Sequence, residues 1–144
     1  MLFLQFTFIF QKKEEIVDTK LEELRKDTKK AEEFFIKMMA YTLGPVELKE
    51  MIKNNHAKIL DVRDYSDYTQ GHIPNAVSMP RHEMEDRINE LSKEDLSIVY
   101  CYNQQCHLGL CACRFLASNG YPCMHLEGGY KVWSEDFQFA TTHE

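Results

Sequence analysis

The sequence lacks a hydrophobic run long enough to cross a membrane. Its longest apolar stretch, Met1 to Phe10, has ten residues, whereas a membrane-spanning helix needs about 20. The stretch also lacks the basic start and the small cleavage-site residues of a secretory signal, and charged residues follow it closely. We therefore expect no membrane span and no secretion. We interpret the stretch as an apolar plug packed on the domain or as the product of a misassigned start codon.

Basic residues are too few to form a nucleic-acid-binding surface. The chain has 17 Lys and Arg against 23 Asp and Glu, which gives a formal net charge of −6. No basic patch stands out along the sequence. This charge disfavours nucleic acid and anionic membranes as general partners, although a local pocket for a small anion is compatible with it.

The cysteine pattern argues against a disulfide-stabilised secreted protein. The chain has five cysteines, an odd number, and three of them crowd together at Cys106, Cys111 and Cys113. The disulfide frameworks of small secreted proteins have an even number of spaced cysteines instead. A reducing cytoplasm is therefore the expected location.

Glycine and proline are absent from Lys12 to Met39, so nothing in this stretch breaks a helix. Apolar residues recur there at helical spacing: Val17, Leu21, Leu24, Ala31, Phe35 and Met38, with Thr28 completing the pattern. This spacing predicts one long amphipathic helix. Two arrangements remain open for it, a helix folded back on its own domain and a short coiled coil that forms a homodimer or binds another partner.

The rest of the chain alternates between short apolar strands and helices. Strands are predicted over 41–43, 57–62, 76–79, 97–101 and 123–126. Helices are predicted after Gly44-Pro45, around Met84 to Leu91, over Leu110 to Ala117 and after Gly128-Gly129. This alternation predicts an α/β fold with an open, mostly parallel sheet covered by helices on both faces. The expected organisation is an N-terminal segment (1–40), one domain (41–138) and a C-terminal tail (139–144).

Cys101 ends the most apolar predicted strand and is followed by a polar loop that leads into a helix. Ligands of parallel sheets bind beyond the carboxyl ends of the strands. Backbone N–H groups and the helix dipole at such a turn favour a negatively charged sulfur. Cys101 is therefore a candidate nucleophile, and a buried core cysteine is the alternative.

Three motifs in series resemble those of the rhodanese-like family, and together they cover roughly Tyr41 to Trp133. They are Asp61-Val62-Arg63 with Tyr68-x-x-Gly71-His72-Ile73-Pro74-x-Ala76, Val99-Tyr100-Cys101, and Leu126-Glu127-Gly128-Gly129-x-x-x-Trp133. The resemblance implies a parallel α/β sheet and sulfurtransferase activity without a metal or other cofactor. In that activity a cysteine takes a sulfane sulfur from a small donor such as thiosulfate. It passes the sulfur to a thiol, which a protein can carry, or to another nucleophile.

The resemblance also assigns roles to individual residues. Cys101 becomes the nucleophile that carries the persulfide. The N–H groups of the loop after it become the cradle for substrate and persulfide: Tyr102, Asn103, Gln104, Gln105, Cys106, His107, Leu108 and Gly109. By the same resemblance Asp61 is expected to be structural and Arg63 is a candidate for anion binding. Arg81, just after Met79-Pro80, is a second candidate from its position in the sequence.

The loop departs from the pattern of many active members of the family. It contains no arginine, it is longer than usual, and Gly109 falls where a serine is common. Its second cysteine, Cys106, lies five positions after Cys101, as in some members with longer loops. Cys106 is either a resolving or relay thiol or an incidental loop residue. The missing guanidinium argues against efficient use of thiosulfate.

Other interpretations use the same residues. The main alternative is a non-catalytic or redox-sensing module that uses the Cys101/Cys106 pair and binds a partner through its N-terminal helix. A zinc site from Cys101, Cys106, His107 and Cys111 is disfavoured because no Cys-x-x-Cys spacing is present. Phosphatase or arsenate-reductase chemistry ranks last, since it needs a guanidinium that this loop does not supply.

Two pairs of side chains close to these motifs have simpler expected roles. Cys111 and Cys113 are two residues apart on a predicted helix, so they face different directions and one is expected to pack inward. His107 is expected to be solvated in the loop, and His72 is expected to form structural hydrogen bonds.

Overall fold

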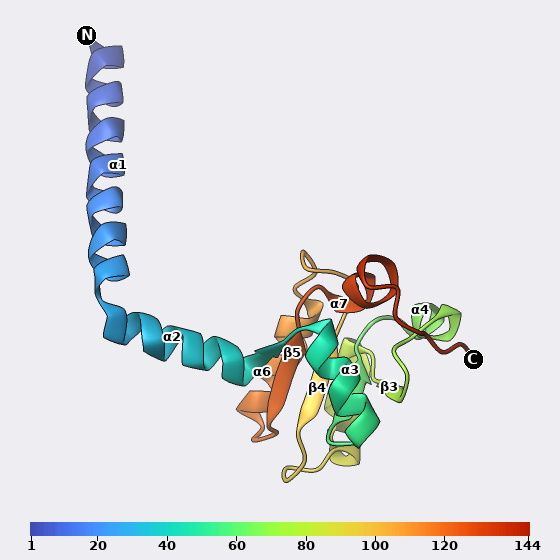
Figure 1. The fold of residues 1–144 in the computed structure, drawn as a ribbon. Helices are drawn as coiled ribbons and strands as arrows, with labels where there is room; N and C mark the ends of the chain where they lie inside the picture. The colour runs from blue at the N-terminus through green and yellow to red at the C-terminus, as the bar shows by residue number, and fades with distance from the viewer. The chain divides into compact units, whose positions relative to one another are not determined.

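The structure, a computed structural model, describes all residues 1–144, which divide into two compact units, Met1–Met39 and Ala40–Glu144. The first unit is helical, with α1 (Leu2–Lys26) followed by α2 (Thr28–Tyr41) (Figure 1). None of the residues in these two helices is buried. No helix of the chain combines the length and apolarity that crossing a bilayer requires. The fold-back and coiled-coil arrangements of this segment stay predictions.

The predicted long N-terminal helix is confirmed as α1, but it does not continue to Met39 because it is interrupted at Asp27. The backbone there leaves the helical region (φ −80, ψ 77), so α1 ends and α2 begins. Asp27 Oδ1 accepts a hydrogen bond from the Lys30 backbone N–H at 3.2 Å, and Asp27 Oδ2 pairs with Lys30 Nζ at 2.9 Å. Aspartate is a poor residue for a helix interior but a good N-cap, which explains why the chain starts a new helix here.

The second unit contains a five-stranded sheet in the order β1-β5-β4-β2-β3, and every pairing is parallel. The strands are β1 (Thr42–Leu43), β2 (Lys58–Asp61), β3 (Ala76–Ser78), β4 (Ser97–Tyr100) and β5 (Cys123–Leu126). The register places Asp61 beside Tyr100 and Val99 beside His125. All five strands were predicted, and the predicted parallel α/β fold is confirmed.

Helices cover both faces of the sheet (Figure 1). They are α3 (Pro45–Asn54), α4 (Tyr65–Gln70), α5 (Met84–Arg87), α6 (Leu108–Ser118) and α7 (Gly129–Lys131). Leu48 of α3 and Trp133, in the π-helical turn η3 (Val132–Asp136), pack on one face. Ala112 and Leu116 of α6 pack with Met84 of α5 on the other face. These two layers bury the sheet on both sides, as parallel strands require.

Two helical segments differ from the predictions. The helix expected around Met84 to Leu91 is a single turn, α5, between the 3₁₀ turns η1 (Arg81–Glu83) and η2 (Ile88–Glu90). The short helix α4 was not predicted, because its only buried residue is Tyr68, which leaves no apolar periodicity to detect.

The C-terminal segment docks on the second unit. Thr142 and His72 form two reciprocal backbone hydrogen bonds, each 2.9 Å long. The Trp133 indole Nε1–H donates to the Ala140 carbonyl at 2.9 Å. The residues expected to form a tail therefore hold the loop around His72 in place.

Candidate active site

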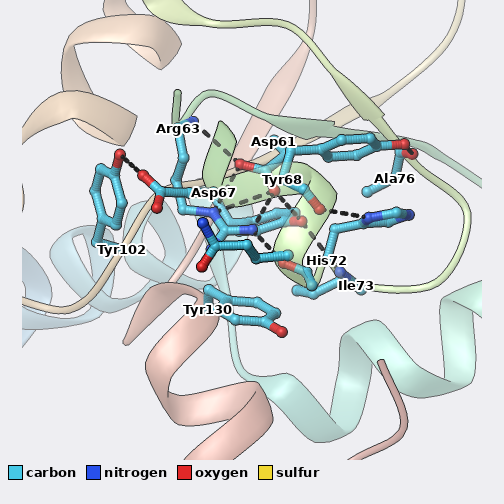
Figure 2. Close-up of polar contacts among 12 residues, drawn as sticks. Asp61, Arg63, Asp67, Tyr68, His72, Ile73, Ala76, Tyr102 and Tyr130 are labelled. Carbon is cyan, nitrogen blue, oxygen red and sulfur yellow. Dashed lines mark hydrogen bonds and ion pairs between the residues drawn. The ribbon is translucent and has the colours of Figure 1, made fainter. Parts of the chain in front are cut away.

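A buried ion pair lies where β2 and β4 end. Arg63 Nη2 donates to Asp61 Oδ2 at 2.7 Å, and Arg63 Nε donates to Asp61 Oδ1 at 3.0 Å (Figure 2). Tyr100, the last residue of β4, donates its hydroxyl to Asp61 Oδ2 at 2.6 Å. Burial and the adjacent Asp61 carboxylate both raise the pKa of Tyr100, so its hydroxyl stays protonated. The cluster fixes the loop that follows β2 against the end of β4.

Arg63 is enclosed by this cluster. Its Nη2 also donates to the Gly71 carbonyl at 2.7 Å, and its guanidinium lies 4.0 Å from the centre of the Tyr130 ring (Figure 2). Burial opposes the charge, but the ion pair with Asp61 raises the pKa of Arg63. Only 3% of Arg63 is exposed. The positive charge of Arg63, a candidate for anion binding, is therefore already paired with Asp61.

Tyr102 ties the loop after Cys101 to α4. Its hydroxyl donates to Asp67 Oδ2 at 2.6 Å and accepts a hydrogen bond from the Asp64 backbone N–H at 3.3 Å (Figure 2). Burial and the Asp67 carboxylate raise the pKa of Tyr102 to about 12. No sequence pattern indicated this contact, since α4 itself was not predicted.

Cys101 is fully buried at the carboxyl end of β4. Its Sγ lies 3.4 Å from the Cys106 carbonyl oxygen and 4.0 Å from that of Asn103. Burial, with a smaller contribution from the Cys106 thiol, raises the pKa of Cys101 to about 11, although the backbone amides of Gly109 and Asn103 act to lower it. In this conformation the thiol is protonated at neutral pH, whereas the position in the sequence indicated a stabilised thiolate.

The loop amides expected to form a cradle are partly engaged elsewhere. Asn103 Oδ1 accepts hydrogen bonds from the Gln105 N–H at 3.0 Å and the Cys106 N–H at 3.1 Å. Gln104 Oε1 accepts one from the Gly128 N–H at 2.7 Å. Of the expected cradle residues, Asn103 and Gly109 are the ones whose amides act on the Cys101 sulfur.

The segment that starts at Gly129 holds the beginning of this loop in place through backbone hydrogen bonds. Tyr130 N–H donates to the Cys101 carbonyl at 2.8 Å, and Lys131 N–H donates to the Tyr102 carbonyl at 2.9 Å. Gly129 has φ +62, and a Cβ atom on it would lie 2.7 Å from the Cys101 carbonyl oxygen and 2.8 Å from the Asn103 nitrogen. The third sequence motif therefore requires glycine because the backbone of the nucleophile loop passes directly over it.

We expect Gly129→Ala to destabilise the protein by about 3 kcal/mol, since the new methyl group meets backbone atoms that have no room to move. Gly120→Ala is the matched control, because Gly120 also has a positive φ (+82) but its nearest neighbour is the flexible Lys93 Nζ at 3.7 Å. The control should cost only about 1 kcal/mol, the price of the left-handed backbone. Urea denaturation of both variants checks this expectation. Equal losses of unfolding free energy would contradict the close packing of Gly129 against the loop.

His125 is a site residue that the sequence interpretation missed. It lies on β5 and is 9% exposed, and its Nε2 has no hydrogen-bond partner. Its Nε2 lies 2.5 Å, and the Cys101 Sγ 3.3 Å, from the position that a Cβ atom on Gly109 would take. The imidazole nitrogen and the thiol sulfur therefore both border the space beside Gly109, without a hydrogen bond between them. Strand alternation predicts that Val99 and Cys101 share a face of the sheet, but only the observed register of β5 against β4 places His125 on that face.

The other cysteines and histidines near the loop differ in their exposure to solvent. Cys111 is exposed and Cys113 is half-buried against the core, so one of the two packs inward as predicted. Cys106 is half-buried and also contacts the core. His107 is exposed, whereas His72 is buried with its Nδ1 2.9 Å from the Tyr68 carbonyl oxygen.

Two further expectations concern charged ligands. No group of three or more His, Cys, Asp or Glu side chains has a geometry that could hold a metal ion. Arg81 follows β3, and its guanidinium lies over the Phe115 ring, 4.6 Å from the ring centre. The structure thus places Arg81 against α6 and Arg63 in the buried ion pair.

Comparisons with known proteins match the second unit. The family model of the rhodanese-like domain matches residues 44–136. The thiosulfate sulfurtransferase GlpE of Stutzerimonas stutzeri is 27% identical over 101 residues, which cover 69% of this chain and 91% of GlpE. The structure of BH2092 from Bacillus halodurans is similar, with a TM-score of 0.76 and 28% identity over 81% of this chain and 87% of that one.

A longer relative has a different name. The HTH-type transcriptional regulator Rv0324 of Mycobacterium tuberculosis is 30% identical over 87 residues, or 60% of this chain. The match spans only 38% of the regulator's length. The matched part is therefore a module that occurs in proteins of different organisation.

Proposed function

Because this chain belongs to the rhodanese-like domain family, we propose that it is a sulfurtransferase that carries a sulfane sulfur as a persulfide on Cys101. The observation that carries the proposal is the position of Cys101. It is the first residue after the central strand β4, beneath the start of α6, with the Gly109 amide acting on its sulfur. The similarity to GlpE, a protein named a thiosulfate sulfurtransferase, supports the same assignment.

The chemistry takes place in two displacements. The Cys101 thiolate attacks the outer sulfur of a small donor, the S–S bond of the donor breaks, and the donor remainder leaves with the electron pair. An acceptor thiolate then attacks the outer sulfur of the persulfide and releases the Cys101 thiolate. The amides of Asn103 and Gly109 stabilise the negative sulfur in both steps. Arg81 is the remaining candidate for binding an anionic donor, since Asp61 neutralises Arg63.

The test is intact-mass analysis after incubation with thiosulfate and, in parallel, with an organic persulfide. Sulfur transfer predicts an added mass of one sulfur atom that a thiol reductant removes. Because the loop has no arginine, we expect stronger loading from the organic persulfide than from thiosulfate. A chain that takes up no sulfur from either donor would contradict the proposal.

A redox-sensing module is the second candidate, favoured by the interaction between the Cys106 and Cys101 thiols. In that case a hydroperoxide oxidises the two thiols to one disulfide and is itself reduced to an alcohol or to water. The N-terminal unit would then recruit the partner. All five cysteines are free thiols in the structure, so neither Cys101 nor Cys106 is committed to another disulfide.

If the chain acts as a redox sensor, mild hydrogen peroxide is expected to form the Cys101–Cys106 disulfide in the wild type. Non-reducing peptide mapping should show this crosslink, and Cys106→Ser should abolish it. Cys111→Ser is the matched control and should leave the crosslink intact, because Cys111 is exposed on α6. Oxidation that links other cysteines, or none, would rule out this switch.

A further inference from the structure

The His125 imidazole is a buried polar group that no contact within the fold accounts for. Buried polar atoms nearly always have a hydrogen-bond partner, because leaving one unpaired costs about 1–3 kcal/mol. His125 Nε2 has none. It faces the empty side of Gly109, the same place that the Cys101 sulfur faces. Nε2 forms no hydrogen bond with the Cys101 thiol in this conformation, in which Sγ lies 3.4 Å from the Cys106 carbonyl oxygen, so proton transfer requires the thiol to turn toward the space beside Gly109.

The local structure holds the imidazole in this place. His125 pairs with Val99 in the β5–β4 register, so its side chain lies on the face of the sheet that α6 covers. Cys101, two residues after Val99, points to the same face. Gly109, in the first turn of α6, supplies the space, since any Cβ atom there would overlap the ring. The ring of His125 thus fits in this place only because residue 109 has no side chain.

We propose that His125 Nε2 is the proton acceptor for the Cys101 thiol, an inference that rests on the proposed role of Cys101 as the nucleophile. The S–H bond of Cys101 breaks as its proton moves to the Nε2 lone pair, and the resulting thiolate attacks the donor's outer sulfur. A Cys101–sulfur bond forms, the donor's S–S bond breaks, and the donor remainder leaves with the electron pair. The proton stays on His125 beside the persulfide anion and returns to Cys101 when an acceptor thiolate removes the outer sulfur.

The electrostatics of the site fit this role. Burial raises the pKa of Cys101, so the thiol does not ionise by itself at neutral pH. Burial lowers the pKa of His125, against a smaller opposing effect of Glu127, so its imidazole is neutral with a free Nε2 lone pair, and the same burial makes it a weaker base than an exposed histidine. The other titratable groups that face the pair are the thiols Cys106 and Cys113. A neutral thiol is a far weaker base than a neutral imidazole, so neither of them can replace His125 as the proton acceptor.

The test measures the rate at which iodoacetamide alkylates Cys101 between pH 6 and pH 9, read by peptide mass spectrometry. In the wild type the rate should rise as His125 loses its proton and then stay nearly level. In His125→Asn it should be roughly 100-fold lower at pH 7 and climb by about tenfold per pH unit, because only the spontaneously formed thiolate reacts. His125→Gln, which is closer in size, should show the same profile and serves if the asparagine variant does not fold.

His56→Asn is the matched control, since His56 is exposed before β2 and should keep the wild-type profile. A His125 variant whose alkylation profile matches the wild type would overturn the proposal, even if its thermal stability falls. Alkylation requires no sulfur donor, so this result is independent of the proposed function. If the wild type takes up no sulfur yet shows the His125-dependent profile, the sulfur-transfer assignment fails while the thiol–imidazole pair stands.

Discussion

Replacing Cys101 by serine is expected to abolish persulfide formation, a loss of about 10³-fold or more against the wild type. A hydroxyl at this position is a far weaker nucleophile toward sulfane sulfur than a thiolate, and no neighbouring thiol occupies the end of β4. The measurement is the rate of loading from an organic persulfide donor, followed by intact mass. Because Cys101 is fully buried and serine is nearly the same size, the variant should remain folded.

Cys111→Ser is the control for this result. Cys111 is the exposed thiol of α6, so it is the cysteine most open to nonspecific reaction with the donor. The Cys111 variant should load as the wild type does. If instead Cys101→Ser loads normally and Cys111→Ser does not, the sulfur resides on a surface thiol and the active-site assignment is wrong.

Removing the Asp61 carboxylate is expected to cost about 3–5 kcal/mol of folding free energy, the largest stability effect expected of a single substitution here. In Asp61→Ala the Arg63 guanidinium stays buried without its counter-ion, and Tyr100 loses the acceptor of its 2.6 Å hydrogen bond. Urea denaturation monitored by circular dichroism gives the change. A loss below about 1 kcal/mol, the range of exposed ion pairs, would contradict the role of this cluster.

Two further variants identify the cause. Asp61→Ala combined with Arg63→Met should recover part of the loss, because the uncompensated charge is then gone. Glu50→Ala breaks the exposed Lys53–Glu50 pair on α3 and should be hard to distinguish from the wild type. A double variant as unstable as Asp61→Ala would show that the loss does not come from the stranded charge.

The sheet could be predicted because its strands carry their own signal. Each is a short apolar run bounded by turn residues, and burial on both faces makes such runs continuous. The segments for which the prediction was wrong or missing carry no such signal. Asp27 stops a helix through its capping geometry, which the surrounding apolar spacing hides, and α4 buries only Tyr68. Helix breaks and short helices depend on local hydrogen bonds more than on periodicity.

The place of Cys101 at the end of β4 could be predicted from the sequence, but its surroundings could not. The position of Cys101 follows from the end of β4, whereas its protonation depends on burial and on which loop groups turn toward the sulfur. Arg63 follows a strand end, as expected, yet its charge is paired with Asp61 inside the fold. His125 looks like an ordinary strand residue between Met124 and Leu126. Only its register beside Val99 and the space at Gly109 connect it with the thiol.

The central claim is that Cys101 carries the transferred sulfur, and locating that sulfur within the loaded chain tests it most directly. Tryptic digestion without reductant leaves the four cysteines from Cys101 to Cys113 in one peptide that ends at Arg114. Fragment spectra then assign the added sulfur to one of them. We predict that it resides on Cys101. Sulfur found chiefly on Cys111, or spread over all four thiols, would contradict the account.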